Sequence, residues 1–363
     1  CKKNTLLNFY NSGTLARLLI GILSTTPDIE VKITGDNSLK KRNMSKIINL
    51  MNEFGAEFYP KDKKFLPLKL VSSELPIGIK YKAGVSAQLK SAVILAGTNS
   101  FGTTTIIEQK KSRDHTENML LASPKVIKIK KSKDKVIQIF GKNYLNSLKI
   151  NVPGDTSAAA FYTALTILNK NSQLKIKNIG FNSTRNGFYE LLKKHGAKIT
   201  FRNKKKINNE PICDILIKSG NLKKPIQAAV NLYERMPDEY PILFCLAGLT
   251  RGISVFKGIE DLANKESNRI KEMQKILRQI GIKSEASKNQ LKIFGKAHVK
   301  NMKKVINIEN LGDHRICMSA AIISLATGIK TKIKNFETVN TSSPNFLEII
   351  KLLGGKYEIK KKL

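Results

Sequence analysis

The chain has 363 residues, of which 41% are hydrophobic and 25% charged, and this composition excludes a disordered or fibrous protein. Lys and Arg outnumber Asp and Glu by 64 to 28, giving a formal net charge of +36. The length favours two domains, with a cleft between them. No apolar run approaches the ~20 residues of a membrane span, and no signal peptide pattern is present. The four cysteines lack the spacing of a zinc site or a disulfide framework, so we expect no metal.

Three turns of small residues each lead into a strongly apolar helix. The turns and the predicted helices are 11–14 before 15–23, 86–88 before 89–97, and 154–157 before 158–168. Helices that are apolar over most of their circumference belong inside a domain. We therefore predict buried central helices whose first turns emerge at a common surface.

An internal repeat is marked by helices that end at glycine. Four such ends occur, at Gly55, Gly196, Gly281 and Gly354, and each is predicted to be followed by a strand. Glycine is favoured there because the residue after a helix often adopts a positive φ. The repeated unit is therefore a helix, a tight turn and a strand.

A polar and often basic segment precedes each of these helices, at residues 40–45, 182–187, 264–269 and 340–345. Basic side chains at a helix N-terminus suit phosphate or carboxylate ligands, but simple capping by Ser, Thr and Asn explains the same composition. The Val152-Pro153-Gly154 break predicts a boundary between domains at 1–152 and 153–363.

The positive charge has three explanations: nucleic acid, small phosphorylated substrates, or a bias toward lysine. Binding of nucleic acid is disfavoured because the 15 Phe and 9 Tyr fall mostly in apolar periodic segments and Trp is absent. We therefore expect neither nucleic acid nor membrane as a partner.

Eight short motifs occur in an order and at separations that are specific to one family. They are Asn11–Leu18, Gly35–Arg42, Ser86–Ala92, Ser112–Glu117, Pro153–Ser157, Asp238–Pro241, Lys265–Arg269 and Gly312–Arg315. From residue 9 to residue 350 the chain resembles the EPSP synthases. The resemblance implies an α/β fold of repeated βαβαββ units around buried parallel helices, in two domains with the active site in the interdomain cleft.

The resemblance also implies a reaction without a cofactor. In it, the enolpyruvyl group of phosphoenolpyruvate is transferred to the 5-hydroxyl of shikimate 3-phosphate, through a tetrahedral intermediate that loses phosphate. The product belongs to chorismate and aromatic amino acid biosynthesis, and glyphosate is the expected inhibitor. We expect a monomer in the cytoplasm, or in a plastid if the source is eukaryotic.

The resemblance assigns residues to both substrates. The phosphoenolpyruvate contacts are Gly13, Arg42, Gln88, Arg269 and Arg315. Guanidinium groups match carboxylate and phosphate oxygens, and Gly13 allows a ligand to approach the backbone. The shikimate 3-phosphate contacts are Ser86, Ala87, Gln88, Ser112, Arg113, Asp238 and Lys265. Helix capping is the alternative role of the two serines.

Two carboxylates are the acid and base candidates. Asp238 resembles the base at the 5-hydroxyl, and Glu266 resembles the acid that later removes the methyl proton. Opposed proton transfers call for two carboxyl groups in different environments.

The chain departs from the family pattern in three places. The family's early Lys-Ser pair and following Arg are expected to lie upstream of Cys1. Asn43 replaces a proline after Arg42, and Asn268 replaces an aspartate before Arg269. An inactive fragment or degenerate copy therefore stays open as an alternative, as does the related transferase that acts on UDP-N-acetylglucosamine. Against the latter stand the Ser86 and Ser112 motifs and the lack of a first-domain cysteine other than Cys1.

Overall fold

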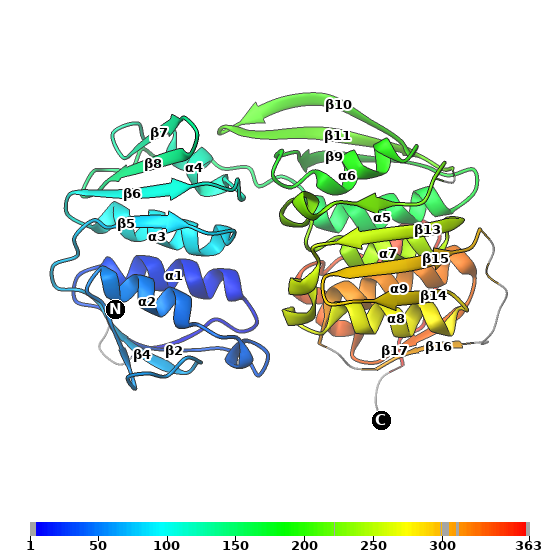
Figure 1. The fold of residues 1–363 in the computed structure, drawn as a ribbon, viewed down its shortest axis with the longest axis horizontal. Helices are drawn as coiled ribbons and strands as arrows, with labels where there is room; N and C mark the ends of the chain where they lie inside the picture. Colours follow the sequence, from blue (N-terminus) through cyan, green and yellow to red (C-terminus); the bar gives the residue numbers. More distant parts are fainter. Residues whose placement is uncertain (1–4, 221, 298, 300–304, 310–311, 361–363) are drawn as a thin grey trace. The chain divides into compact units, whose positions relative to one another are not determined.

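A computed structural model describes residues 5–220, 222–297, 299, 305–309 and 312–360 (Figure 1). The chain divides into two compact units. Unit 1 is Cys1–Asn151 with Ile207–Glu210, and unit 2 is Val152–Lys206 with Pro211–Leu363. Cys1 lies outside the described residues.

Unit 1 contains the βαβαββ unit twice. The first copy consists of β1 (Thr5–Asn8), α1 (Gly13–Thr25), β2 (Glu30–Thr34), the short 3-10 helix η1 (Leu39–Lys41), α2 (Ser45–Glu53), β3 (Glu57–Tyr59) and β4 (Leu68–Val71). The second consists of β5 (Lys80–Ala83), α3 (Ala87–Asn99), β6 (Thr103–Glu108), α4 (His115–Leu120), β7 (Ile127–Lys131) and β8 (Lys135–Phe140). Their sheets have the equivalent orders β1-β2-β4-β3 and β5-β6-β8-β7, and each starts with a parallel pair and continues antiparallel.

Helices α1, α2 and α3 lie between the two sheets of unit 1 (Figure 1). Helices α1 and α3 pack at very short range, because a Cβ atom on Gly21 would lie 2.6 Å from the carbonyl oxygen of Ala92. Only glycine permits this approach of the two backbones. The first turns of α1 and α3 are thereby held in a fixed relation.

Unit 2 contains three further copies, of which two are incomplete. The first consists of α5 (Thr156–Leu168), β9 (Gln173–Gly180), α6 (Gly187–Lys194), β10 (Lys198–Ile207) and β11 (Glu210–Lys218). The second is β12 (Gln227–Ala228), η2 (Val230–Arg235), α7 (Tyr240–Gly248), β13 (Gly252–Lys257), η3 (Glu260–Asn264), α8 (Arg269–Gln279), β14 (Lys283–Ala286) and β15 (Gln290–Gly295). The third is β16 (Val305–Ile308), α9 (His314–Thr327), β17 (Lys330–Ile333), η4 (Phe336–Thr341) and α10 (Phe346–Leu352).

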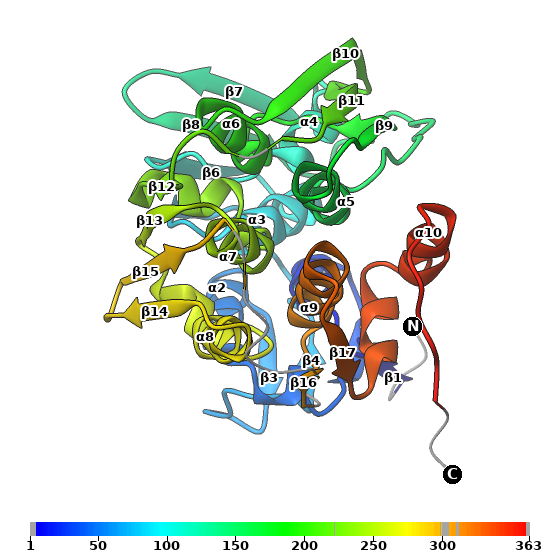
Figure 2. The same cartoon turned by 90° about the vertical axis from the view of Figure 1, so that its right-hand side faces the viewer.

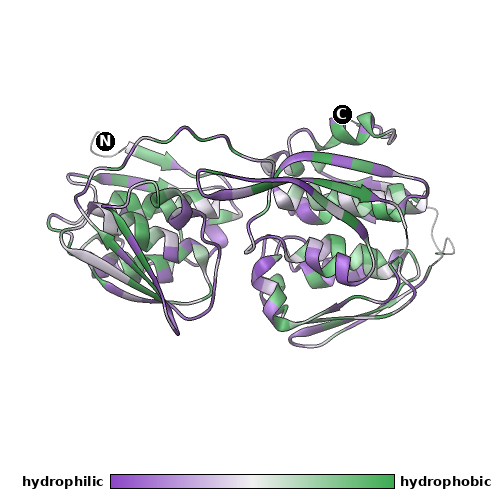
Figure 3. Ribbon diagram, turned by 90° about the horizontal axis from the view of Figure 1, so that it is seen from above, coloured by the Kyte–Doolittle hydropathy of each residue, from purple (hydrophilic) through white to green (hydrophobic). Residues whose placement is uncertain are grey.

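The sheets of unit 2 follow the same plan, with orders β10-β11-β9, β12-β13-β15-β14 and β16-β17. Helices α5, α7, α8 and α9 lie inside them (Figure 2). Every residue of α7 is buried, and the strands alternate between hydrophobic and hydrophilic residues (Figure 3). The prediction of repeated units around buried helices is confirmed.

The predicted glycine turns have the expected backbone conformation. Gly55, Gly196, Gly281 and Gly354 have φ values of 91°, 96°, 73° and 86°. Strands β3, β10 and β14 follow the first three. The predicted strand after Gly354 is wrong, since residues 355–360 form no regular element. No helix within the described residues is long and apolar enough to cross a membrane.

Candidate active site

Helices α1 and α3 of unit 1 both begin at predicted site residues. Ser12 caps α1 by accepting a hydrogen bond from Leu15 N at 3.1 Å, and Ser86 caps α3 through Leu89 N at 3.4 Å. The capping role considered for Ser86 is therefore present. Helix N-termini carry unpaired N–H groups and a positive partial charge, so these starts favour anions.

Two arginines gather at the start of α1. A Cβ atom on Gly13 would lie 2.8 Å from Nη1 of Arg17 and 3.0 Å from Nη1 of Arg42. Arg17 Nη1 also donates to Gly13 O and to Gln88 Oε1, each at 3.0 Å, and Gln88 Nε2 donates to Thr14 Oγ1 at 2.8 Å. The predicted residues Gly13, Arg42 and Gln88 are thus brought together.

Arg17 is a candidate that the motif analysis did not single out. Burial and the nearby cation of Arg42 lower the pKa of Arg17, although a guanidinium stays protonated. Two neighbouring cations repel each other unless an anion lies between them. The sequence feature that could have identified Arg17 is its position, one turn into a helix whose other residues are mostly apolar.

Arg42 is held through a short chain of side chains. Its Nη2 donates to Asn11 Oδ1 at 3.3 Å, and Asn11 Nδ2 donates to Asp36 Oδ2 at 2.8 Å. Asn43, which replaces the family proline, accepts from Ser45 N at 2.8 Å at the start of α2. The substitution therefore supplies a hydrogen bond to the helix start in place of a fixed φ.

Ser112 lies in the loop between β6 and α4 and is 4% exposed. Its Oγ donates to Glu108 Oε1 at 2.7 Å, and its N–H donates to the same oxygen at 2.9 Å. Arg113, the next residue, is partly exposed. The hydroxyl hydrogen of Ser112 is therefore already engaged within the protein.

Unit 2 gathers three carboxylates around one guanidinium. Arg269, at the start of α8, is 1% exposed. Its Nη2 donates to Glu266 Oε2 at 2.7 Å and its Nε to Asp313 Oδ2 at 3.0 Å, while its Nη1 lies 3.6 Å from Asp238 Oδ1. The predicted residues Asp238, Glu266 and Arg269 therefore share one site.

Asp313 orients this site, although the sequence analysis gave it no role. It accepts from Ser267 Oγ at 2.9 Å and caps α9 through the N–H of Arg315 at 3.0 Å. Burial alone would raise the pKa of Asp313, but Arg269 outweighs burial and the pKa lies below its ordinary value. Conversely, Asp313 and Glu266 outweigh the effect of burial on Arg269 and raise its pKa. The pair is therefore charged.

Two guanidinium groups in unit 2 retain unused donors. Nη1 of Arg269 and Nη1 of Arg315 are buried and have no hydrogen-bond partner among the described residues. Arg315 is 7% exposed and its guanidinium lies 5.8 Å from the centre of the Phe161 ring. Buried donors are nearly always satisfied, so these two atoms are candidate donors to a bound anion.

Asn268 does not weaken this arrangement. Its Oδ1 accepts from Lys271 N at 3.1 Å and caps α8, while Glu266 and Asp313 hold Arg269. The loss of the family aspartate at position 268 therefore leaves Arg269 paired.

Lys265, a predicted shikimate 3-phosphate contact, is paired within the protein. Its Nζ lies 2.8 Å from Asp261 Oδ2 and 5.9 Å from the ring centre of Tyr233.

A second buried group adjoins Asp238 in sequence. Glu239 is 1% exposed and accepts a short hydrogen bond from Ser157 Oγ. Arg185 Nη2 donates to Ser157 Oγ at 2.7 Å and to Asp155 Oδ1 at 2.9 Å. Burial, and then the charge of Asp238, raise the pKa of Glu239. The sequence analysis gave Glu239 no role, because within the Asp238–Pro241 motif it assigned a function to Asp238 alone.

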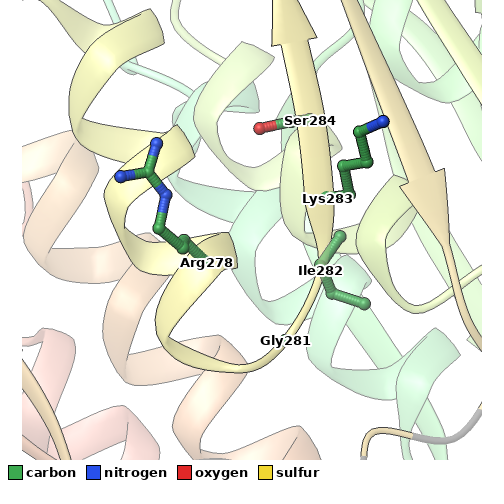
Figure 4. Close-up of a pocket in the computed structure, with 5 residues that line it drawn as sticks. All are labelled: Arg278, Gly281, Ile282, Lys283 and Ser284. Atoms are coloured by element: carbon green, nitrogen blue, oxygen red, sulfur yellow. The ribbon is translucent and has the colours of Figure 1, made fainter.

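A shallow pocket elsewhere is unrelated to these residues. It is lined by Arg278, Gly281, Ile282, Lys283 and Ser284 (Figure 4). These residues lie at the C-terminal end of α8, in the turn that follows it and on β14, whereas Arg269 begins α8. The pocket contains none of the predicted site residues.

Comparison with known proteins decides the family. The family model of EPSP synthase (3-phosphoshikimate 1-carboxyvinyltransferase) matches residues 1–350. The chain belongs to the EPSP synthase family. As a member, it is 38% identical over 348 residues to the 3-phosphoshikimate 1-carboxyvinyltransferase of Petrotoga mobilis, covering 95% of this chain and 79% of that protein. The Bacillus subtilis enzyme of the same name is 36% identical over 355 residues, covering 97% and 81%.

Solved structures agree with the EPSP synthase assignment. The EPSP synthase of Acinetobacter baumannii superposes with a TM-score of 0.83 at 34% identity, covering 98% of this chain and 80% of that one. The enolpyruvyl transferase NikO of Streptomyces tendae has a TM-score of 0.69 at 14% identity, covering 94% and 76%, and shows likeness of fold alone. The predicted family and fold are confirmed.

Proposed function

We propose that the chain catalyses transfer of the enolpyruvyl group of phosphoenolpyruvate to the 5-hydroxyl of shikimate 3-phosphate, releasing phosphate. Membership of the EPSP synthase family supports this reaction. The observation that carries it is that the buried Nη1 atoms of Arg269 and Arg315 have no hydrogen-bond partner among the described residues, while the carboxylates Asp238 and Glu266 lie beside Arg269. A trianion such as phosphoenolpyruvate would satisfy both donors.

The arginines of both units take part in binding under this proposal. The phosphoenolpyruvate contacts are Gly13, Arg42, Gln88, Arg269 and Arg315, to which we add Arg17. The shikimate 3-phosphate contacts are Ser86, Ala87, Gln88, Ser112, Arg113, Asp238 and Lys265, and Ser112 also donates to Glu108.

Asp238 is the proposed base at the 5-hydroxyl. Its side chain is 27% exposed, so a ligand can reach it. As Asp238 takes the hydroxyl proton, the oxygen bonds to C2 of phosphoenolpyruvate and a proton is added at the C3 methylene. The tetrahedral adduct then loses phosphate from C2 and a proton from C3.

Glu266 is the proposed acid at C3 of phosphoenolpyruvate. It accepts a 2.7 Å hydrogen bond from Arg269 Nη2. This bond holds the carboxyl group of Glu266 beside the arginine that we assign to phosphoenolpyruvate binding.

A phosphate-release assay tests the function. The purified protein is mixed with phosphoenolpyruvate and either shikimate 3-phosphate or UDP-N-acetylglucosamine. Release that depends on shikimate 3-phosphate is expected, with formation of the enolpyruvyl ether checked by mass spectrometry. Release only with the UDP-sugar would favour the related transferase, and no release with either would favour an inactive copy. The monomeric state and cytoplasmic location stay predictions.

A further inference from the structure

Four charged side chains meet inside unit 1. They are Lys90 of α3, Glu108 at the end of β6, Glu117 of α4 and Lys135 at the start of β8. Lys90 Nζ lies 2.7 Å from Glu108 Oε1 and 2.7 Å from Glu117 Oε1. Lys135 Nζ lies 3.2 Å from Glu108 Oε2 and 2.9 Å from Glu117 Oε1. We call these four residues the buried ion network.

The net charge of the buried ion network is zero, and its four side chains are almost completely buried. The side chains of Lys90 and Glu108 are 0% exposed, Glu117 is 1% exposed and Lys135 is 18% exposed. Burial alone would raise the pKa of Glu108, but hydrogen bonds from Lys90 and Ser112 outweigh it and the pKa lies below its ordinary value. Buried ion pairs usually add little net stability compared with apolar residues. A gain in folding stability therefore does not explain why these four charged residues are buried together.

The buried ion network is hydrogen-bonded to the loop that carries Ser112 and Arg113, between β6 and α4. Glu108 Oε1 accepts hydrogen bonds from Lys90 Nζ, from Ser112 N and from Ser112 Oγ, at 2.7, 2.9 and 2.7 Å. Both donors of Ser112 are used in this way. In this state Ser112 anchors its loop, which also carries the adjacent Arg113, a proposed contact of shikimate 3-phosphate.

The same network reaches the second binding segment. Lys90 belongs to the first turns of α3, whose start carries Ser86 and Gln88. A further hydrogen bond, from Thr116 Oγ1 to Ser91 Oγ at 2.8 Å, joins α4 to α3 beside the network. The loop and the helix start are thus tied to one another through Glu108 and Lys90.

We propose that Glu108, held by Lys90, is a positioning residue for shikimate 3-phosphate: it fixes the Ser112–Arg113 loop relative to the start of α3. This inference rests on the proposed function. It predicts that loss of the Glu108 acceptor weakens binding of shikimate 3-phosphate far more than it raises the KM for phosphoenolpyruvate. No contact of Glu108 with a substrate is required.

Two variants separate positioning from stability. Glu108→Gln weakens the hydrogen bonds to Ser112 and leaves Lys90 with less compensating charge, so both affinity and stability should fall. In the double variant Lys90→Met with Glu108→Leu, two opposite charges are removed together and Glu117 keeps Lys135 as its partner. Apolar replacement of a buried pair is often neutral or stabilising, so stability should return while Ser112 still lacks its acceptor.

Calorimetric titration with shikimate 3-phosphate is the decisive measurement, with urea unfolding on the same samples. We expect the affinity of the double variant to be about tenfold or more below wild type, as for loss of charged hydrogen bonds. Lys61→Met, which removes an exposed ion pair of the same unit with Glu57, is the control and should bind as wild type does. Affinity that returns together with stability would show a merely structural role and overturn the proposal.

Hydrogen exchange gives a readout that does not depend on the substrate. Without ligand, the amide of Ser112 should exchange faster in the double variant than in wild type, because its acceptor is gone. Equal exchange in the two proteins would overturn the anchoring role. Failure of wild type to bind shikimate 3-phosphate would overturn the proposed function, and the substrate role of Glu108 with it. Normal binding by both proteins would overturn the positioning role alone.

Discussion

Arg269 donates to Glu266 at 2.7 Å from Nη2 and to Asp313 at 3.0 Å from Nε. One guanidinium thus joins a carboxylate that we assign to proton transfer with another that is buried and structural. Its remaining nitrogen, Nη1, has no hydrogen-bond partner among the described residues.

Removal of either proposed proton-transfer group should reduce turnover more than affinity. In Glu266→Gln or Asp238→Asn, kcat should fall by roughly 10²- to 10⁴-fold, because each variant loses one acid or base. The KM values of both substrates should change much less. Glu272→Gln on the same helix, which removes only a contact with Lys275, should leave kcat near wild type. Turnover near wild type in the first two variants would contradict the assigned roles.

Asp313→Asn should destabilise unit 2. It leaves Arg269 buried with one carboxylate fewer, and breaking a buried ion pair costs about 3 kcal/mol or more. The free energy of unfolding is measured in urea. Glu309→Gln is the control, since its ion pair with Lys334 is 71% and 69% exposed and its loss should change stability by less than about 0.5 kcal/mol. Equal stability of the two variants would argue against the structural role of Asp313.

Arg17→Gln should weaken phosphoenolpyruvate binding, because it removes one of the two cations beside Gly13. The KM for phosphoenolpyruvate should rise by about tenfold or more, as expected for hydrogen bonds to a charged group. The KM for shikimate 3-phosphate should rise less. Lys46→Gln removes an exposed cation from α2 of the same unit and should change neither value. An unchanged KM in Arg17→Gln would exclude Arg17 from the site.

Stability should fall in mild acid because of His195. Its Nδ1 lies 2.8 Å from Leu191 O and its Nε2 accepts from Gln227 N at 3.1 Å, so the ring is neutral in this arrangement. Burial lowers the pKa of His195 below its ordinary value of 6.5. The unfolded chain therefore binds the proton more readily, and the stabilisation is fully present above pH 6.5 and is lost as the pH falls below it.

Urea unfolding between about pH 7.5 and about pH 5 tests this sign. The midpoint should fall with pH in wild type and fall less in His195→Gln. A slope remains in that variant because burial and the charge of Arg315 also lower the pKa of His314, to about 4. A midpoint that rises toward acid pH, or a slope unaffected by the substitution, would contradict the prediction.

Local features were well predicted from the sequence. The turns at Gly55, Gly196 and Gly281 depend on neighbouring residues alone, and a positive φ explains each glycine. The strand expected after Gly354 depends on a partner strand as well, and the alternation of residues could not supply one. The arginines Arg42 and Arg269 were found because they lie within motifs.

Long-range pairing was the part that sequence could not reveal. Lys90 and Glu117 read as ordinary charged residues on helices, and only the fold shows that they meet inside unit 1. Ser112 was assigned as a shikimate 3-phosphate contact from the family resemblance, and only the fold shows that its hydroxyl also donates to Glu108. Residues that hold other residues carry no motif of their own, because their partners lie far away along the chain.

Gly21 limits the substitutions that the contact between α1 and α3 can tolerate. Since a Cβ atom on Gly21 would lie 2.6 Å from the backbone of Ala92, any side chain at position 21 would push the axes of α1 and α3 apart. Such a shift would also separate Arg17 from Gln88, which are joined by one hydrogen bond at the helix starts. A variant with altered specificity therefore has little freedom to move one helix alone, and selection should act on the two helices together.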